Sequence, residues 1–171
     1  MTKLLVCSDI HGRRTVMEAI LAAHADADVI LFLGDGERDF EALDIPDAGR
    51  KKIFNVCGNC DMHSSAAVSR TEKVDGRKLF MTHGHFFHVK SGTEYLAMTA
   101  RDAGCDMAFF GHTHDPYYED VLGVHLFNPG AVLEGCYGIV ELSEHGISFT
   151  HWQIRFDADT PYSERIAPVR W

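Results

Sequence analysis

The chain has 171 residues, of which 46% are hydrophobic and 24% charged, so it is long enough for a single domain, 1–171, with a sizeable core. Its 25 acidic and 16 basic side chains give a net charge of −9, which argues against non-specific nucleic-acid binding because that binding needs lysine and arginine to neutralise phosphates. No apolar run approaches the ~20 residues of a membrane span, and a secretory signal is lacking, so we expect a cytoplasmic protein with reduced cysteines and no membrane partner.

The first third of the chain alternates short apolar runs with helical patterns. Residues 4–8 form an apolar run that predicts a buried strand, and apolar residues at helical spacing predict a helix over 15–25. A second buried strand is expected at 28–33, a short helix at 37–43 and a third strand at 52–56.

Strand-like runs dominate the remainder. Two of them flank Asp75-Gly76, a pair typical of a hairpin turn. Ser91-Gly92-Thr93-Glu94 resembles a capping box that begins a helix ending near Ala103, with Gly104 as its stop. The strands expected here lie at 68–74, 77–82, 106–110, 117–121, 124–127, 136–142 and 147–154.

These elements predict an α/β fold of the α+β sandwich type, in which two packed mixed β-sheets are flanked by helices. The core should cover about residues 3–154, and 155–171 form a C-terminal segment, either a tail or an edge segment. Among the histidines that this pattern leaves aside, we expect His145 and His151 to be exposed.

Five of the apolar strands end in polar clusters. Ligands bind beyond the carboxyl ends of strands in α/β sheets, so these clusters should converge. Aspartate and histidine accept several transition-metal ions, and two ions ~3.5–4 Å apart can clamp a phosphoryl group. Each cluster alone is common, but together they predict a site for two metal ions. The clusters are Asp9-Ile10-His11, Gly34-Asp35, Gly58-Asn59-Cys60-Asp61, His83 and Gly111-His112-Thr113-His114.

In order and spacing, these clusters resemble the five sequence blocks of the calcineurin-like metallophosphoesterases. The short chain and the Gly-Asn-Cys-Asp form are similar to the small YfcE-type phosphodiesterases, and so is the loop Asn128-Pro129-Gly130. The resemblance covers about residues 3–142. It implies a metallophosphoesterase-like four-layer architecture and hydrolysis of a phosphate ester, most simply a phosphodiester, by in-line attack of a metal-bound hydroxide.

The resemblance also implies a role for each matching residue. One ion would be held by Asp9, His11 and His114, the other by Asn59, His83 and His112, and Asp35 would bridge the two. Asp61 would orient a nearby ligand through a hydrogen bond. His85 could contact the substrate, although an ordinary loop histidine would look the same. The catalytic group would thus comprise Asn59, Cys60, Asp61, His83 and His85.

Cys60 departs from the wider superfamily, which has a histidine at this position. A thiol with a reference pKa of ~8.5 is a poorer proton donor than an imidazolium. This favours substrates with good leaving groups, or a substitute donor such as His85 or His63.

Two other functions remain open. Cys57-Gly58-Asn59-Cys60 is a C-x-x-C motif, which could indicate a thiol oxidoreductase, although no clear helix is predicted after it. The same fold also resembles a retromer subunit, a non-catalytic protein-binding scaffold that has lost some of its metal-site histidines, whereas this chain retains all seven candidate ligands.

The cofactors predicted are two divalent metal ions. We expect Mn²⁺, with Ni²⁺, Zn²⁺, Fe or Mg²⁺ as alternatives that the ligand set also accepts. The expected partner is a small phosphate-ester substrate, and an exposed β edge could pair chains into a homodimer or higher oligomer.

Overall fold

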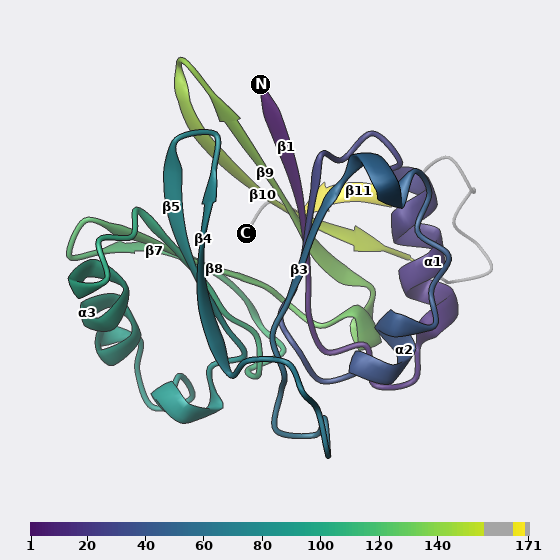
Figure 1. The fold of residues 1–171 in the computed structure, drawn as a ribbon, viewed down its shortest axis with the longest axis horizontal. Coiled ribbons are helices and arrows are strands. Elements are labelled where there is room, and N and C mark those ends of the chain that lie inside the picture. The colour runs from purple at the N-terminus through teal and green to yellow at the C-terminus, as the bar shows by residue number, and fades with distance from the viewer. Residues whose placement is uncertain (156–165, 170–171) are drawn as a thin grey trace.

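The computed structural model describes residues 1–155 and 166–169. Two β-sheets face one another, α1 and α2 flank the first of them, and α3 flanks the second (Figure 1). The layers therefore run helix, sheet, sheet, helix. Both sheets contain parallel and antiparallel pairs, which confirms the prediction of two packed mixed sheets flanked by helices.

The first sheet has the strand order β11-β10-β9-β1-β2-β3. β1, β2 and β3 are parallel, and β9 pairs antiparallel with β1 on the other side. β11 lies at the sheet edge within the predicted C-terminal segment, while 156–165 and 170–171 lie outside the described residues. The strands are β1 (Thr2–Cys7), β2 (Val29–Phe32), β3 (Lys52–Asn55), β9 (Cys136–Ser143), β10 (Gly146–Ile154) and β11 (Ile166–Val169).

The second sheet has the strand order β4-β5-β6-β8-β7. β4 and β5 form the predicted hairpin, and Asp75 and Gly76 at its turn both have positive φ, 49° and 80°, as a tight hairpin turn requires. The strands are β4 (Ser69–Val74), β5 (Arg77–Thr82), β6 (Met107–Phe109), β7 (Pro116–Val121) and β8 (Val124–Pro129).

The helices cover the outer face of each sheet. α1 (Arg14–Ala23) buries Val16 and Ile20 against the first sheet, and α2 (Glu37–Glu41) is a short turn after β2. α3 (Glu94–Asp102) buries Leu96 against the second sheet. Three single 3₁₀ turns are η1 (Ala48–Arg50), η2 (His85–Phe87) and η3 (Val132–Glu134). None of the helices described is long and apolar enough to cross a membrane.

The start of α3 differs from the prediction. The helix begins at Glu94 with Thr93 as its N-cap, and neither Ser91 nor Thr93 forms a side-chain capping bond. The Thr93 hydroxyl instead lies 3.3 Å from the Tyr117 hydroxyl, so a tertiary contact takes the group that a cap would use. The helix stop is as predicted, because Gly104 has φ +70° and its N–H donates to a carbonyl of the last turn.

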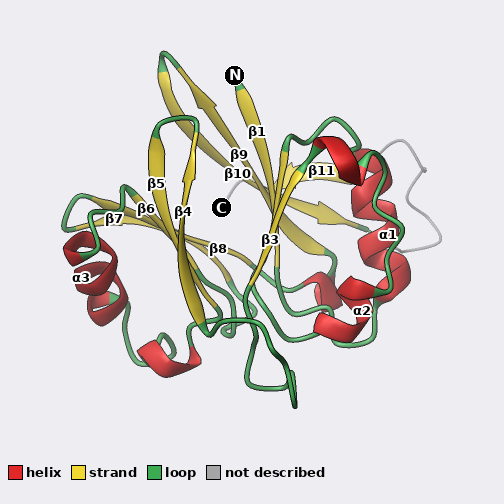
Figure 2. Ribbon diagram, in the orientation of Figure 1, coloured by secondary structure: helices red, strands yellow, loops and turns green. Residues whose placement is uncertain are grey.

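The core fills the space between the sheets and the space under the helices. Leu4 and Val6 of β1 pack between the sheets, while Leu5 and Cys7 of the same strand pack on the α1 side, so β1 is buried on both faces. The loops that follow several strands gather at one end of the two sheets (Figure 2). This arrangement brings together the polar clusters that end the strands.

Candidate metal centre

The loops after β1, β2 and β3 are held in close contact by their backbones. The Asp9 N–H donates to the Gly34 carbonyl at 2.9 Å. A Cβ atom added to Gly58 would lie 2.0 Å from Asp35 Oδ1, closer than any real contact. Glycine is therefore required at 58 for the third loop to approach the Asp35 carboxylate.

A positive φ recurs among the candidate ligands. Five of the ten non-glycine residues with positive φ in the described part of the chain belong to the predicted metal set. The left-handed region is unfavourable for residues with a Cβ atom, and such conformations cluster at functional sites. The five are Asp9 (56°), His11 (44°), Asp35 (58°), His112 (69°) and His114 (66°).

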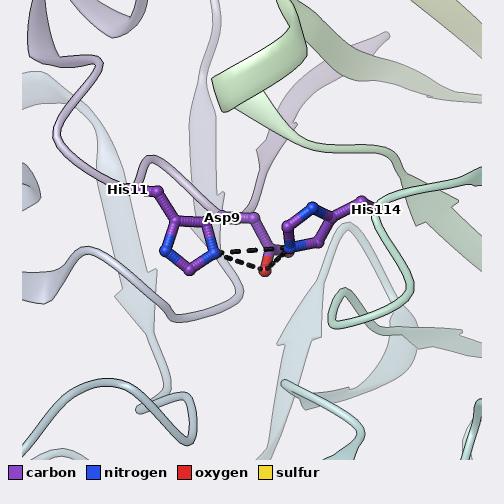
Figure 3. A group of neighbouring side chains, drawn as sticks. All are labelled: Asp9, His11 and His114. Carbon is purple, nitrogen blue, oxygen red and sulfur yellow. Dashed lines mark hydrogen bonds and ion pairs between the residues drawn. The ribbon is translucent and has the colours of Figure 1, made fainter.

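Asp9, His11 and His114 converge on one point (Figure 3). Asp9 Oδ1 lies 3.1 Å from His114 Nε2 and 3.5 Å from His11 Nε2, and the two Nε2 atoms are 3.3 Å apart. Neighbouring ligand atoms about 2.0–2.2 Å from one ion are separated by about 2.8–3.6 Å in tetrahedral or octahedral geometry. The three side chains are thus spaced to share one metal ion.

A second group consists of Asp9, Asp35 and His83, all of them buried. His83 Nε2 lies 3.3 Å from Asp35 Oδ2 and 3.9 Å from Asp9 Oδ1. His83 Nδ1 is 2.8 Å from the Leu33 carbonyl, which can only accept, so Nδ1 carries a proton and a neutral ring turns its Nε2 lone pair toward the carboxylates.

Two atoms of this group are buried without a hydrogen-bond partner in the described structure, namely Asp9 Oδ1 and His83 Nε2. Buried polar atoms are normally satisfied, and a cation held among these ligand atoms would satisfy both of them. The donor set therefore fits the divalent ions that the residue types indicate.

The charges in the group shift the pKa values of its members. Burial alone would raise the pKa of the Asp35 carboxyl, but His83 and the Cys60 amide outweigh burial and lower it. For His83, burial lowers the pKa, but Asp35 and Asp9 outweigh it, and the net shift is upward. Burial, together with His83, lowers the pKa of His112 to about 4, so that His112 is a neutral imidazole at neutral pH, the form that binds metal.

Asp61 holds the loop after β2 in place. Its carboxylate accepts hydrogen bonds from four backbone N–H groups, those of Asp35, Gly36, Glu37 and Gly58, at 2.8–2.9 Å. Burial raises the pKa of Asp61, but these four donors lower it further than burial raises it. The carboxylate is therefore fixed in its charged form beneath the Asp35 turn.

Cys60 lies beside Asp35 and His11. Its backbone N–H donates to Asp35 Oδ1 at 2.7 Å, and its Sγ atom is within 4.8 Å of ligand atoms of both residues. Burial raises the pKa of the Cys60 thiol, and Asp35 raises it further.

The remaining predicted residues are placed less tightly. The His112 ring centroid lies 5.1 Å from that of His83. The His85 ring lies 5.5 Å from His83, its Nδ1 is buried without a partner in the described structure, and burial together with His83 lowers its pKa. Asn59 is exposed, and its side-chain amide donates to Cys60 Sγ, so the described contacts do not join it to the other candidate ligands.

Several supporting residues were not predicted. The Ser8 hydroxyl donates to Asp9 Oδ2 at 2.6 Å, and the buried Asn128 amide donates to Gly111 O and to Thr113 Oγ1, fixing the loop that carries the β6 histidines. Asn128 was expected in a loop after the strand at 124–127, whereas it is buried in β8, which extends to Pro129. The expectation that His151 is exposed is wrong, because its ring is buried and pairs with the Asn128 carbonyl at 2.8 Å.

With this geometry in place, comparison with known families identifies the chain. Residues 2–145 match the calcineurin-like phosphoesterase superfamily domain. The chain belongs to the calcineurin-like phosphoesterase superfamily. The resemblance drawn from the strand-end clusters is thereby confirmed, and membership of this metallophosphoesterase family implies divalent metal ions.

Relatives of this calcineurin-like phosphoesterase are named for the same chemistry. It is 29% identical over 154 residues to "Phosphodiesterase YfcE" of Escherichia coli strain K12, covering 77% of this chain and 80% of the relative. A conserved protein of Streptococcus pneumoniae TIGR4, described as a predicted phosphoesterase, has a solved structure with a TM-score of 0.74 at 22% identity, covering 89% of each chain. The metallophosphoesterase-like four-layer fold is confirmed.

The fold is also shared with proteins of another name. A crystal structure of a single mutant of Vps29 from Entamoeba histolytica matches with a TM-score of 0.77 at 19% identity over 99% of this chain and 98% of that one. At this identity the likeness concerns the fold alone, so function has to be argued from the site.

Proposed function

We propose that this calcineurin-like phosphoesterase is a dinuclear-metal phosphodiesterase that acts on a small phosphate ester. The observation that carries the proposal is the pair of buried atoms Asp9 Oδ1 and His83 Nε2, which lie 3.9 Å apart within the group Asp9, Asp35 and His83 and have no hydrogen-bond partner in the described structure. A metal ion bound there would satisfy both atoms.

The first ion would be held by Asp9, His11 and His114, whose three ligand atoms have the separations that one ion requires. The second would be held by His83 and His112, whose rings meet edge to face with centroids 5.1 Å apart. Asn59 would join the second ion by rotating its amide away from Cys60.

Asp35 would bridge the two ions. Its Oδ2 lies 3.3 Å from His83 Nε2 and 3.8 Å from His11 Nε2, between the two groups, and its lowered pKa keeps it ionised. Two bound ions would neutralise the phosphoryl oxygens and acidify a water for attack on phosphorus. The Asp61 carboxylate would keep the Asp35 turn in position through its hydrogen bonds with backbone N–H groups.

The leaving group would depart without strong proton donation from Cys60. Burial, and then Asp35, raise the pKa of the Cys60 thiol, so it is neutral, and it stands where the wider superfamily has histidine. His85, with its unpartnered Nδ1 beside His83 and His112, would contact a phosphoryl oxygen or the leaving group. This arrangement favours diesters with good leaving groups over monoesters of ordinary alcohols.

The direct test is hydrolysis of bis(p-nitrophenyl) phosphate by metal-free protein reloaded with Mn²⁺, Ni²⁺, Zn²⁺ or Mg²⁺, together with metal analysis of the purified protein. We expect about two ions per chain, with Mn²⁺ the most effective, and turnover that His114→Ala and Asp35→Asn abolish. His145→Ala, a change at an 87% exposed side chain, is the matched control. The absence of turnover with every ion would refute the proposal.

The alternative of a protein-binding scaffold has one supporting observation, the shared fold with Vps29. It predicts a stable protein that takes up metal and hydrolyses no phosphate ester, whereas the phosphodiesterase proposal predicts turnover. The hydrolysis assay therefore separates the two.

The alternative of a thiol oxidoreductase has less support. No helix follows the C-x-x-C motif anywhere in residues 56–68, and burial raises the pKa of Cys57 as well as that of Cys60, whereas reactive thiols have lowered values. Cys57→Ser should abolish a thiol-dependent activity and leave phosphodiester hydrolysis in place.

A further inference from the structure

A cavity of about 670 Å³ opens directly from the candidate metal centre. His11 and Cys60, which belong to one of the groups of candidate ligand atoms, form part of its wall. The rest of the wall comes from α2 and from the loop that follows Cys60. A phosphoryl group at the metal centre would thus have one of its ester arms beside this cavity, whose volume suits a small organic group.

Charged side chains distinguish this wall. Glu37, Asp39, Glu41 and Asp61 are the acidic residues of the wall, and the only arginine or lysine among its described residues is Arg38. Asp61 and Asp39 bond to backbone N–H groups, and the amide of Asn55 lies 3.4 Å from Glu37 Oε1.

These contacts give carboxylate oxygens of Asp61, Asp39 and Glu37 hydrogen-bond donors that carry no positive charge. Glu37 is almost fully buried, so its charge is poorly screened by solvent. Four acidic residues against one arginine give the wall a net negative formal charge.

From this we infer that the cavity is a specificity pocket for the ester arm of the substrate and that it selects an arm carrying a positive charge, such as an amino alcohol. This inference rests on the proposed phosphodiesterase function. The metal centre supplies positive charge for the phosphate, and the wall beside it supplies negative charge for the arm. A second anionic group on the arm would be repelled by the same carboxylates.

The test uses three phosphonates of matched length, which have no ester bond to hydrolyse: 3-aminopropylphosphonate, butylphosphonate and 3-phosphonopropionate. Their binding to the Mn²⁺-loaded protein is measured by titration calorimetry at low salt. We expect the amino compound to bind on the order of tenfold more tightly than the carboxylate compound, with the affinity of the neutral compound between the two. In 0.5 M NaCl the differences in affinity among the three compounds should become smaller.

Glu41 is the residue to change, because it is exposed and has no interaction with other described residues. Glu41→Lys should reduce the preference for the amino compound at least threefold, and Glu41→Gln should reduce it by less. Glu144→Lys makes the same charge change at an 86% exposed residue outside the cavity wall and should leave the preference unchanged.

Equal binding of the three compounds, a reversed order, no binding by any of them, or a preference that Glu41→Lys leaves intact would each overturn the inference. Bis(p-nitrophenyl) phosphate hydrolysis, measured in the same preparations, tests the proposed function separately. Turnover without charge preference refutes the pocket alone, whereas charge preference without turnover refutes the phosphodiesterase function and leaves a cavity that binds cationic phosphonates.

Discussion

The four hydrogen bonds to Asp61 make this residue the most informative one to change. Asp61→Ala would leave the N–H groups of Asp35, Gly36, Glu37 and Gly58 without their acceptor. Hydrogen bonds to a charged group contribute about 1.5–3 kcal/mol each, so four of them set an upper limit of about 6–12 kcal/mol.

Partial solvent access reduces this limit. Asp61 is only half-buried, so water can replace some of the lost bonds, and contributions within one network do not add. We therefore expect Asp61→Ala to lower the free energy of unfolding by about 3–5 kcal/mol. Asp61→Asn retains one acceptor oxygen and should lose about half as much. Because the Asp35 turn would loosen, metal affinity should fall by about 10- to 100-fold.

Urea unfolding of the metal-free protein measures the stability term, and titration calorimetry with Mn²⁺ measures the affinity. Asp39→Ala is the matched control, because the Asp39 carboxylate accepts one exposed backbone bond, from Gly12 at 2.9 Å, and its loss should cost under about 1 kcal/mol. If Asp61→Ala were no more destabilising than Asp39→Ala, the carboxylate would not be the support that we describe.

Three other predictions concern pH, close packing and metal removal. Burial lowers the pKa of His24 to about 4, below its unfolded value of 6.5, so the stability that neutral His24 contributes is complete above pH 6.5 and is lost as pH falls toward 4. The free energy of unfolding should therefore be about 2 kcal/mol lower at pH 5.0 than at pH 7.5, and His24→Gln should remove this difference. An equal difference in both proteins would contradict the prediction. Gly111→Ala would place a Cβ atom 2.0 Å from the Ser8 hydroxyl and should lower the free energy of unfolding in urea by about 1–3 kcal/mol. Gly49→Ala, which has open space around the added Cβ atom, should leave it nearly unchanged. Equal effects of the two substitutions would exclude the clash. Removal of metal with a chelator should lower the melting temperature by several degrees relative to protein in Mn²⁺ at about 100 times its Kd, because bound metal at that concentration adds about 2.7 kcal/mol to the free energy of unfolding. An unchanged melting curve would mean that the native state binds no metal.

Most of the fold could be predicted because its strands are short apolar runs with clear ends. The run at 4–8 became β1, and the Asp75-Gly76 pair became the β4–β5 turn. The start of α3 could not be predicted, because the Thr93 hydroxyl bonds to Tyr117, 24 residues further along the chain. Local sequence rules do not contain such a contact.

The candidate site divides in the same way. Asp9, His83 and His114 follow strands, so strand topology alone was enough to predict that they meet. His151 was misjudged because its partner, the Asn128 carbonyl, belongs to the other sheet. Asn59 lies in a loop and its side chain is exposed, so neither strand topology nor sequence spacing fixes its rotamer. Its role as a metal ligand stays a prediction.

The candidate centre takes its ligands from both sheets, which has a consequence for folding kinetics. Asp9 and His11 follow a strand of the first sheet, His83 and His114 follow strands of the second, and His11 and His114 are 103 residues apart in the chain. A metal ion held by both sets would act as a reversible cross-link, formed only after the sheets have packed. Interactions absent from the folding transition state slow unfolding and leave the folding rate nearly unchanged. Metal occupancy would then set how long the native protein persists rather than how fast it forms.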